Sequence, residues 1–129
     1  MGMSKDYATL LYEWLNGFAP TFRSPILSST FDEDNPKPNE YIEYSANAGN
    51  FNTDFMQAIT IYSTNTSYSR VMDIADNIEN AVTENGTIVR ADWGYITIYK
   101  GSPFYQDKPD EDDNIRAGYV NLIIRINRS

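Results

Sequence analysis

The stretch with the most obvious chemical potential is a run of four carboxylates, Asp110-Glu111-Asp112-Asp113, with Asp107 shortly before it. Carboxylates can bind Mg²⁺ or act in pairs as general acids and bases. A hydrolytic pair must flank its substrate at a fixed separation, and a metal needs ligands that converge from rigid elements. Adjacent acids in one loop lack such support. The run therefore predicts a solvated acidic loop and not a catalytic centre.

A second acidic stretch, Asp32-Glu33-Asp34-Asn35, invites a calcium interpretation. The helix–loop–helix calcium motif needs a glycine after its third ligand and a glutamate at loop position 12. Neither requirement is met here. Four prolines between residues 20 and 38 instead predict that residues 19–39 are irregular, with at most a short extended piece from residue 25 to 27.

The sequence contains no cysteine and no histidine. Disulfides, thiolate nucleophiles, the commonest metal ligand and the usual general base near neutral pH are therefore all missing. There is also no glycine-rich phosphate loop. These absences favour a protein that is not an enzyme and needs no metal or cofactor.

The net charge of −8 lies wholly in two segments. Residues 32–43 hold five acids and one base, and so do residues 107–113, whereas the rest of the chain has eight acids and eight bases. Nucleic-acid binding needs the opposite sign, so these segments are expected to repel DNA. No apolar run approaches the roughly 18 to 20 residues that span a bilayer, and no signal pattern is recognised, so neither a membrane nor export is expected.

Apolar periodicity predicts the elements that must position these acids. Two helices are expected, because apolar residues recur on one face of a 3.6-residue period; they cover residues 4–16 and 67–84. Alternation and β-branched residues predict strands at 40–44, 54–63, 87–90, 94–100 and 118–127. The last two strands form a hairpin whose long loop begins at residue 101. Phe104 and Tyr105 predict that this loop has a docked base, and the acids after them a mobile tip.

This order of elements predicts an α+β fold in one domain, residues 1–129. We expect a mostly antiparallel sheet of four to five strands, with both helices packed on one face. The other face would then be uncovered. The predicted strands carry six tyrosines, namely Tyr41, Tyr44, Tyr62, Tyr95, Tyr99 and Tyr119. Tyrosine is common both at half-buried sheet positions and at protein interfaces, and an uncovered aromatic face favours self-assembly.

Several short patterns, taken together and in order, resemble a known family. They are NEYIEY at 39–44, IYS at 61–63, SRVMDIADNI at 69–78, YKGSPF at 99–104 and DNIRAGYV at 113–120. The chain resembles the tail terminator (tail completion) proteins of long-tailed bacteriophages of Gram-positive hosts, and is similar in plan to the lambda U protein. The resemblance covers nearly the whole chain.

The resemblance implies an α+β subunit of a hexameric ring in the virion tail, assembled in the host cytoplasm. Such a ring caps the tail tube, stops its polymerisation and joins the tail to the head. Its partners would be further copies of itself, the tail tube protein and a head-closure or connector protein, with DNA only passing through. The family has no catalytic residues. Residues expected to face the assembly or the channel are Asp32, Glu33, Asp34, Phe104, Tyr105, Asp107, Asp110, Glu111, Asp112 and Asp113.

Two other interpretations remain open at this point. The first is another phage neck or tail subunit, such as a head-closure or tail-tube protein. The second is an acidic host-directed binding protein, for instance a nucleic-acid mimic whose clustered carboxylates occupy a basic groove.

Overall fold

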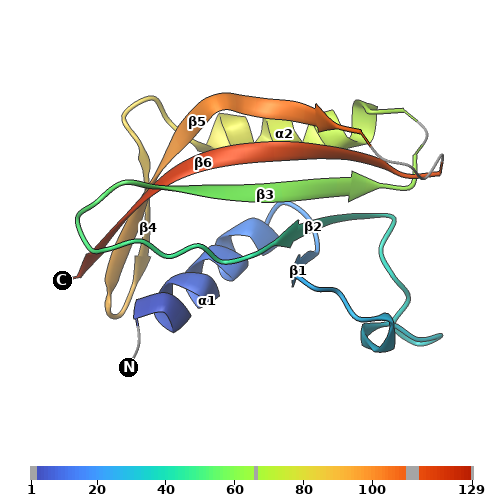
Figure 1. Cartoon of the computed structure of the whole chain (residues 1–129), viewed down its shortest axis with the longest axis horizontal. Coiled ribbons are helices and arrows are strands. Elements are labelled where there is room, and N and C mark those ends of the chain that lie inside the picture. The colour runs from blue at the N-terminus through green and yellow to red at the C-terminus, as the bar shows by residue number, and fades with distance from the viewer. Residues whose placement is uncertain (1–2, 66, 110–113, 129) are drawn as a thin grey trace.

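One curled sheet organises the computed structural model, which describes residues 3–65, 67–109 and 114–128 (Figure 1). Its strands are β1 (Thr21–Arg23), β2 (Glu40–Tyr44), β3 (Phe55–Ser63), β4 (Thr87–Ala91), β5 (Gly94–Lys108) and β6 (Arg116–Arg128). The helices are α1 (Met3–Asn16) and α2 (Ser69–Ala81), with a 3₁₀ turn at Ser28–Thr30. Across the sheet the order is β1-β2-β3-β6-β5-β4. Only β1 and β2 pair in parallel.

The α+β class, the two helices and the mostly antiparallel sheet agree with the prediction, but the sheet has six strands instead of four or five. The additional strand, β1, lies in the segment that was predicted to be irregular. It pairs with β2 through Thr21 opposite Ile42 and Arg23 opposite Tyr44. The extended piece was therefore expected a few residues too late in the chain.

The strand β6 lies at the centre of the core. Its alternate residues Val120, Leu122, Ile124 and Ile126 are all fully buried, as a strand with one covered face requires. The neighbouring strands supply residues in register, because Ile59 of β3 lies opposite Val120 and Ile98 of β5 opposite Ile124.

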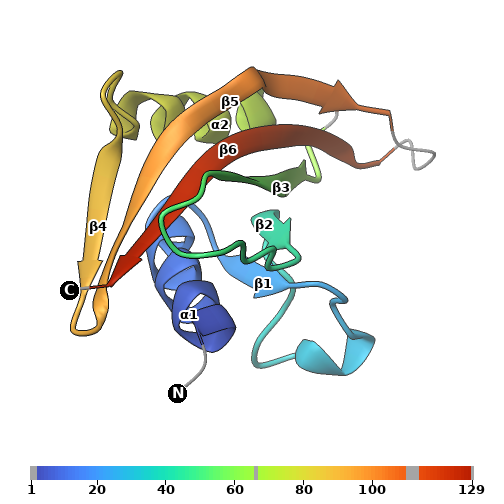
Figure 2. The same ribbon diagram turned by 60° about the vertical axis from the view of Figure 1, so that its left-hand side comes forward.

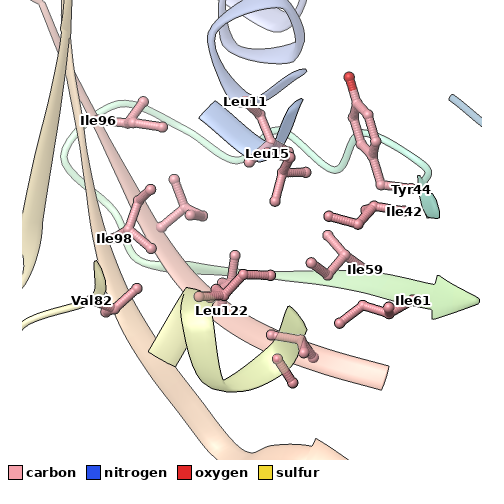
Figure 3. Close-up of a cluster of buried hydrophobic side chains, with 14 of the residues drawn as sticks. Leu11, Leu15, Ile42, Tyr44, Ile59, Ile61, Val82, Ile96, Ile98 and Leu122 are labelled. Atoms are coloured by element: carbon pink, nitrogen blue, oxygen red, sulfur yellow. The ribbon is translucent and has the colours of Figure 1, made fainter. Parts of the chain in front are cut away.

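Both helices pack on this same face, as the sequence predicted. Leu11 and Leu15 of α1 and Val71 and Ile78 of α2 are fully buried in one cluster with the strand residues. Figure 3 shows side chains from helices and strands, Leu15 and Leu122 among them, pointing into this common space.

The curl of the sheet brings its two edges to either side of α1 (Figure 2). At the β1 edge, the Thr21 backbone N–H donates a hydrogen bond to Asn16 Oδ1 of α1 at 3.2 Å. The end of the helix therefore caps the start of that edge strand. At the other edge α1 also contacts β4.

The hairpin of β5 and β6 is longer than predicted. β5 was expected to end at residue 100, but it continues through Pro103 to Lys108, with a register shift between Lys100 and Tyr105. Across this irregularity, Asn121 Nδ2 donates to the carbonyl oxygen of Pro103 at 2.9 Å. The connection between the arms is correspondingly shorter, and Phe104 and Tyr105 lie on the strand and not in a loop.

Candidate functional site: the open face of the sheet

The face of the sheet opposite the helices is the main candidate surface; we call it the open face. In the described part of the chain, neither helix covers it. Alternation and register place on it Phe22, Tyr41, Met56, Tyr62, Ile88, Tyr95, Tyr99, Tyr119 and Ile123. Met56 and Ile88 are large apolar side chains, yet 46% and 49% exposed. These two side chains lie on strands that β6 and β5 separate, so each is a single exposed apolar group and the two do not adjoin.

Aromatic rings form a row across the β1 end of the open face. Phe31 packs edge-to-face on Phe22 with centroids 5.2 Å apart, and Phe22 packs similarly on Tyr41 at 6.1 Å. Tyr41 and Tyr62 are stacked at 5.0 Å with their planes 18° apart. Beside this row lies a hollow of about 440 Å³, with the exposed Leu27 on its rim. The row gives this end of the face a fixed apolar shape.

Lysine and arginine side chains of the same chain lie over several aromatic rings of the open face. Lys37 Nζ is 4.8 Å from the centroid of Tyr41, and the guanidinium of Arg90 is 5.7 Å from that of Tyr95. Lys108 Nζ lies 5.1 Å from the Tyr62 centroid and donates a hydrogen bond of 3.0 Å to the Tyr62 hydroxyl. These cations occupy one side of the Tyr41, Tyr62 and Tyr95 rings and add positive charge to the open face.

Not every predicted strand tyrosine reaches the open face. Tyr44 lies on the helix side, where its buried hydroxyl donates to the carbonyl oxygen of Ala8 at 3.1 Å. It is a core residue that joins β2 to α1. The three-residue spacing from Tyr41 already puts the two rings on opposite faces of one strand.

The predicted acidic turn is built around Asp32. Its Oδ1 accepts hydrogen bonds from the backbone N–H groups of Asp34 at 2.9 Å and Asn35 at 2.8 Å. Asp32 is therefore a structural turn residue, while Glu33 and Asp34 are exposed. The turn follows Phe31, which packs on β1 at the sheet edge.

The other predicted residues lie on β5, near the opposite edge of the sheet. Phe104 and Tyr105 are partly buried against the core and line a hollow of about 290 Å³ next to Met72 of α2. The Tyr105 hydroxyl donates to Asp107 Oδ1 at 2.8 Å. The structure thus brings Phe104, Tyr105 and Asp107 together and places the Asp32 turn elsewhere. The predicted residues Asp110, Glu111, Asp112 and Asp113, with their expected mobile tip, lie outside the described residues.

Four tyrosines have perturbed acidities. Burial raises the pKa of Tyr7, Tyr44, Tyr62 and Tyr105 above the usual value. For Tyr105 the hydrogen bond to the Asp107 carboxylate raises the pKa further, whereas for Tyr62 the Lys108 ammonium opposes the effect of burial.

These shifts predict instability at high pH. An unfolded tyrosine ionises near pH 10, whereas these four hydroxyls keep their protons to higher pH in the folded chain. Their stabilising contribution is complete below pH 10 and falls as the pH rises above it, because the unfolded state then loses protons first. Urea unfolding between pH 8 and 12 should show this fall. Tyr105→Phe should make the decline less steep; an identical slope in the variant would contradict the assignment.

Among residues 3–65, 67–109 and 114–128, no three acidic side chains gather closely enough to hold a metal ion. Within the same ranges, no helix has the length and apolar character to cross a bilayer.

Sequence reasoning found the tyrosines but missed the cations that lie over them. For Arg90 a signal existed, since it directly faces Tyr95 across the β4–β5 hairpin. For Lys108 there was no such signal, because its contact with Tyr62 depends on the registers of β3, β6 and β5 together.

Comparison with protein-family models, curated proteins and solved structures found no match.

Proposed function

We propose that this chain is a structural tail terminator subunit of a bacteriophage. In this proposal, copies form a ring that caps the tail tube, stops its polymerisation and provides the surface to which the head joins. The single observation that carries the proposal is the open face, a sheet surface rich in tyrosines on which Met56 and Ile88 are exposed among polar residues such as Thr60, Asn121 and Arg125. An assembly role alone would fit many proteins. The resemblance of the short sequence patterns to those of tail terminators favours that family among them.

The charge distribution supports the same proposal. Glu33 and Asp34 extend from their turn into solvent, and neither has a structural role like that of Asp32. In a ring through which DNA passes, exposed carboxylates near the channel would keep the phosphate backbone from adhering. The open face, with cations over its rings, would instead contact protein.

The proposed function is tested by mass and by tail length. Light scattering after size exclusion should give six times the mass of one chain, either alone or after addition of tail tubes. Electron microscopy of tails assembled without the protein should show overlong tubes. A strict monomer in both conditions, together with tubes of normal length, would refute the proposal.

A second candidate, an acidic nucleic-acid mimic, is favoured only by the exposed carboxylates. A mimic would bind a basic protein as a monomer and leave tail length unchanged. The same two measurements therefore separate it from a tail terminator.

A further inference from the structure

Part of the open face combines positive charge with an exposed apolar side chain. Ile88 of β4 lies opposite Thr97 of β5, and Thr97 in turn lies opposite Arg125 of β6. Arg90 lies two residues further along β4, on the same face as Ile88. Ile88 is 49% exposed, and both arginines are exposed as well. We call Ile88, Arg90 and Arg125 the arginine patch.

The positive charge of the arginine patch is only partly balanced within the chain. Arg125 Nε lies 2.8 Å from Asp54 Oδ1, but the two side chains are 44% and 51% exposed. An ion pair as exposed as this one stabilises little, so it can rearrange when a partner arrives. Arg90 lies over the ring of Tyr95, and no carboxylate of the described residues forms an ion pair with it. The patch therefore favours a partner that brings carboxylates.

The outer side of α2 has the complementary composition. Met72 is 40% exposed, and Asp73 and Asp76 on the same side of the helix are exposed too. The other two charged residues of α2 form ion pairs with neighbouring elements, at 3.4 and 3.8 Å. Neither aspartate has an ion-pair partner among the residues that the structure describes. This helix therefore presents one apolar side chain and two unpaired carboxylates.

A hollow beside α2 can receive an arginine side chain. It is the hollow of about 290 Å³ that Phe104 and Tyr105 line, and Met72 and Asp76 border it on the side of the helix. Its walls are largely apolar and aromatic, whereas Asp76 and Glu79 contribute carboxylates. An arginine has the same division, since an apolar stem carries its charged head.

The charges argue against a contact between two identical surfaces. Two arginine patches, or two α2 helices, would place like charges against each other, which disfavours association. A contact between the two different surfaces joins opposite charges, and its repetition can close into a ring. The arginine patch lies on the open face of the sheet and α2 on the covered face, so one copy can use both surfaces at once.

We infer that the outer side of α2, through Met72, Asp73 and Asp76, docks on the arginine patch of a second copy of this chain. In this contact Met72 packs against Ile88, and the two aspartates face the two arginines. The inference deepens the proposed function and rests on it only for the statement that the contact repeats around a ring.

Two charge-reversed variants test the contact. One variant, Arg90→Glu with Arg125→Glu, alters only the patch, and the other, Asp73→Lys with Asp76→Lys, alters only α2. Each variant alone should associate roughly tenfold more weakly than the native chain, or weaker still, because like charges then meet. An equimolar mixture should regain native association, because each variant then meets its opposite charge on the other. Light scattering over a concentration series, with and without tail tubes, measures this.

The matched control is Glu33→Lys with Asp34→Lys, which makes the same change of charge at two exposed acids outside both surfaces. It should associate like the native chain, and circular dichroism checks that every variant folds. Native association of Asp73→Lys with Asp76→Lys would overturn the inference. An equal loss in the control, or a mixture no better than its components, would do so too.

Cross-linking gives a second measurement, because the chain has no cysteine. Ile88→Cys and Met72→Cys each place a single thiol on one of the two surfaces. A short bismaleimide should link two chains in a mixture of these variants and leave each variant alone as a monomer. Absence of a linked dimer in the mixture, or an equal yield from Ile88→Cys alone, would contradict the contact.

The outcome is separable from that of the proposed function. Cross-linked dimers together with tails of normal length would refute tail termination and leave the contact intact. Rings that assemble from the α2 lysine variant as readily as from the native chain would exclude the contact and leave the ring proposal intact.

Discussion

Gln57→Leu is expected to lower the free energy of unfolding by about 3 kcal/mol, because leucine leaves the buried Tyr7 hydroxyl and three partly buried backbone groups without their partner. Gln57 is 1% exposed and lies on β3, facing the helices. Its Oε1 accepts hydrogen bonds from the Tyr7 hydroxyl at 2.8 Å and the Asn47 backbone N–H at 3.0 Å. Its Nε2 donates to the carbonyl oxygens of Ser45 and Ala58, both at 2.9 Å. One amide thus joins α1, β3 and the segment after β2.

Urea denaturation of four proteins would measure this: the native chain, Gln57→Leu, Tyr7→Phe and the double variant. Tyr7→Phe removes the hydroxyl donor that Gln57→Leu would otherwise leave without its acceptor. The double variant should therefore be more stable than the sum of the two single losses predicts, by roughly 0.5–3 kcal/mol. Strict additivity, or a loss below about 1 kcal/mol for Gln57→Leu, would show that water satisfies these groups instead.

Elements whose signal is local were predictable from the sequence. The helix α1 begins and ends within one residue of the prediction, because its apolar residues repeat at helical spacing up to Leu15 and Pro20 prevents continuation. The strand β2 agrees at both ends, and β3 begins one residue later than predicted, since alternation defines both. The two helices were correctly expected on one face, because their apolar stripes and the alternating strands need a common core.

Elements that depend on distant partners were not predictable. The strand β1 has three residues, and only pairing with β2, some twenty residues away, makes it a strand. The second half of β5 contains Gly101, Ser102 and Pro103, which locally indicate a loop; the long antiparallel partner β6 nevertheless keeps it in the sheet. Local turn chemistry was overridden by cross-strand pairing in both cases.

The candidate site was predictable to a similar degree. An uncovered sheet face with tyrosines follows from helix placement and alternation, and the structure has such a face. The contact of Lys108 with Tyr62, and the arrangement that places Arg125 and Ile88 on either side of Thr97, follow only from the register of the strands.

Met56→Glu is expected to weaken subunit association at least tenfold, which corresponds to about 1.4 kcal/mol or more. Met56 lies on the open face of β3 opposite Ile123 of β6 and is 46% exposed. If another subunit covers the face, a carboxylate there would be desolvated beside Arg125, which is already paired with Asp54, whereas in the single chain it would stay hydrated. The fold should therefore be retained while assembly is lost.

The matched control is Tyr12→Glu, which places the same charge at an apolar position of similar exposure, 40%, on the outer side of α1. Met56→Leu should preserve assembly, because it keeps the apolar surface. Light scattering over a concentration series, with tail tubes added, measures all three variants, and urea denaturation checks their stability. Equal losses for Met56→Glu and Tyr12→Glu would indicate a general charge effect, and unchanged assembly of Met56→Glu would exclude the open face as the subunit contact. A loss confined to Met56→Glu would locate that contact on the sheet, because the two glutamates carry the same charge at similar exposure on different surfaces.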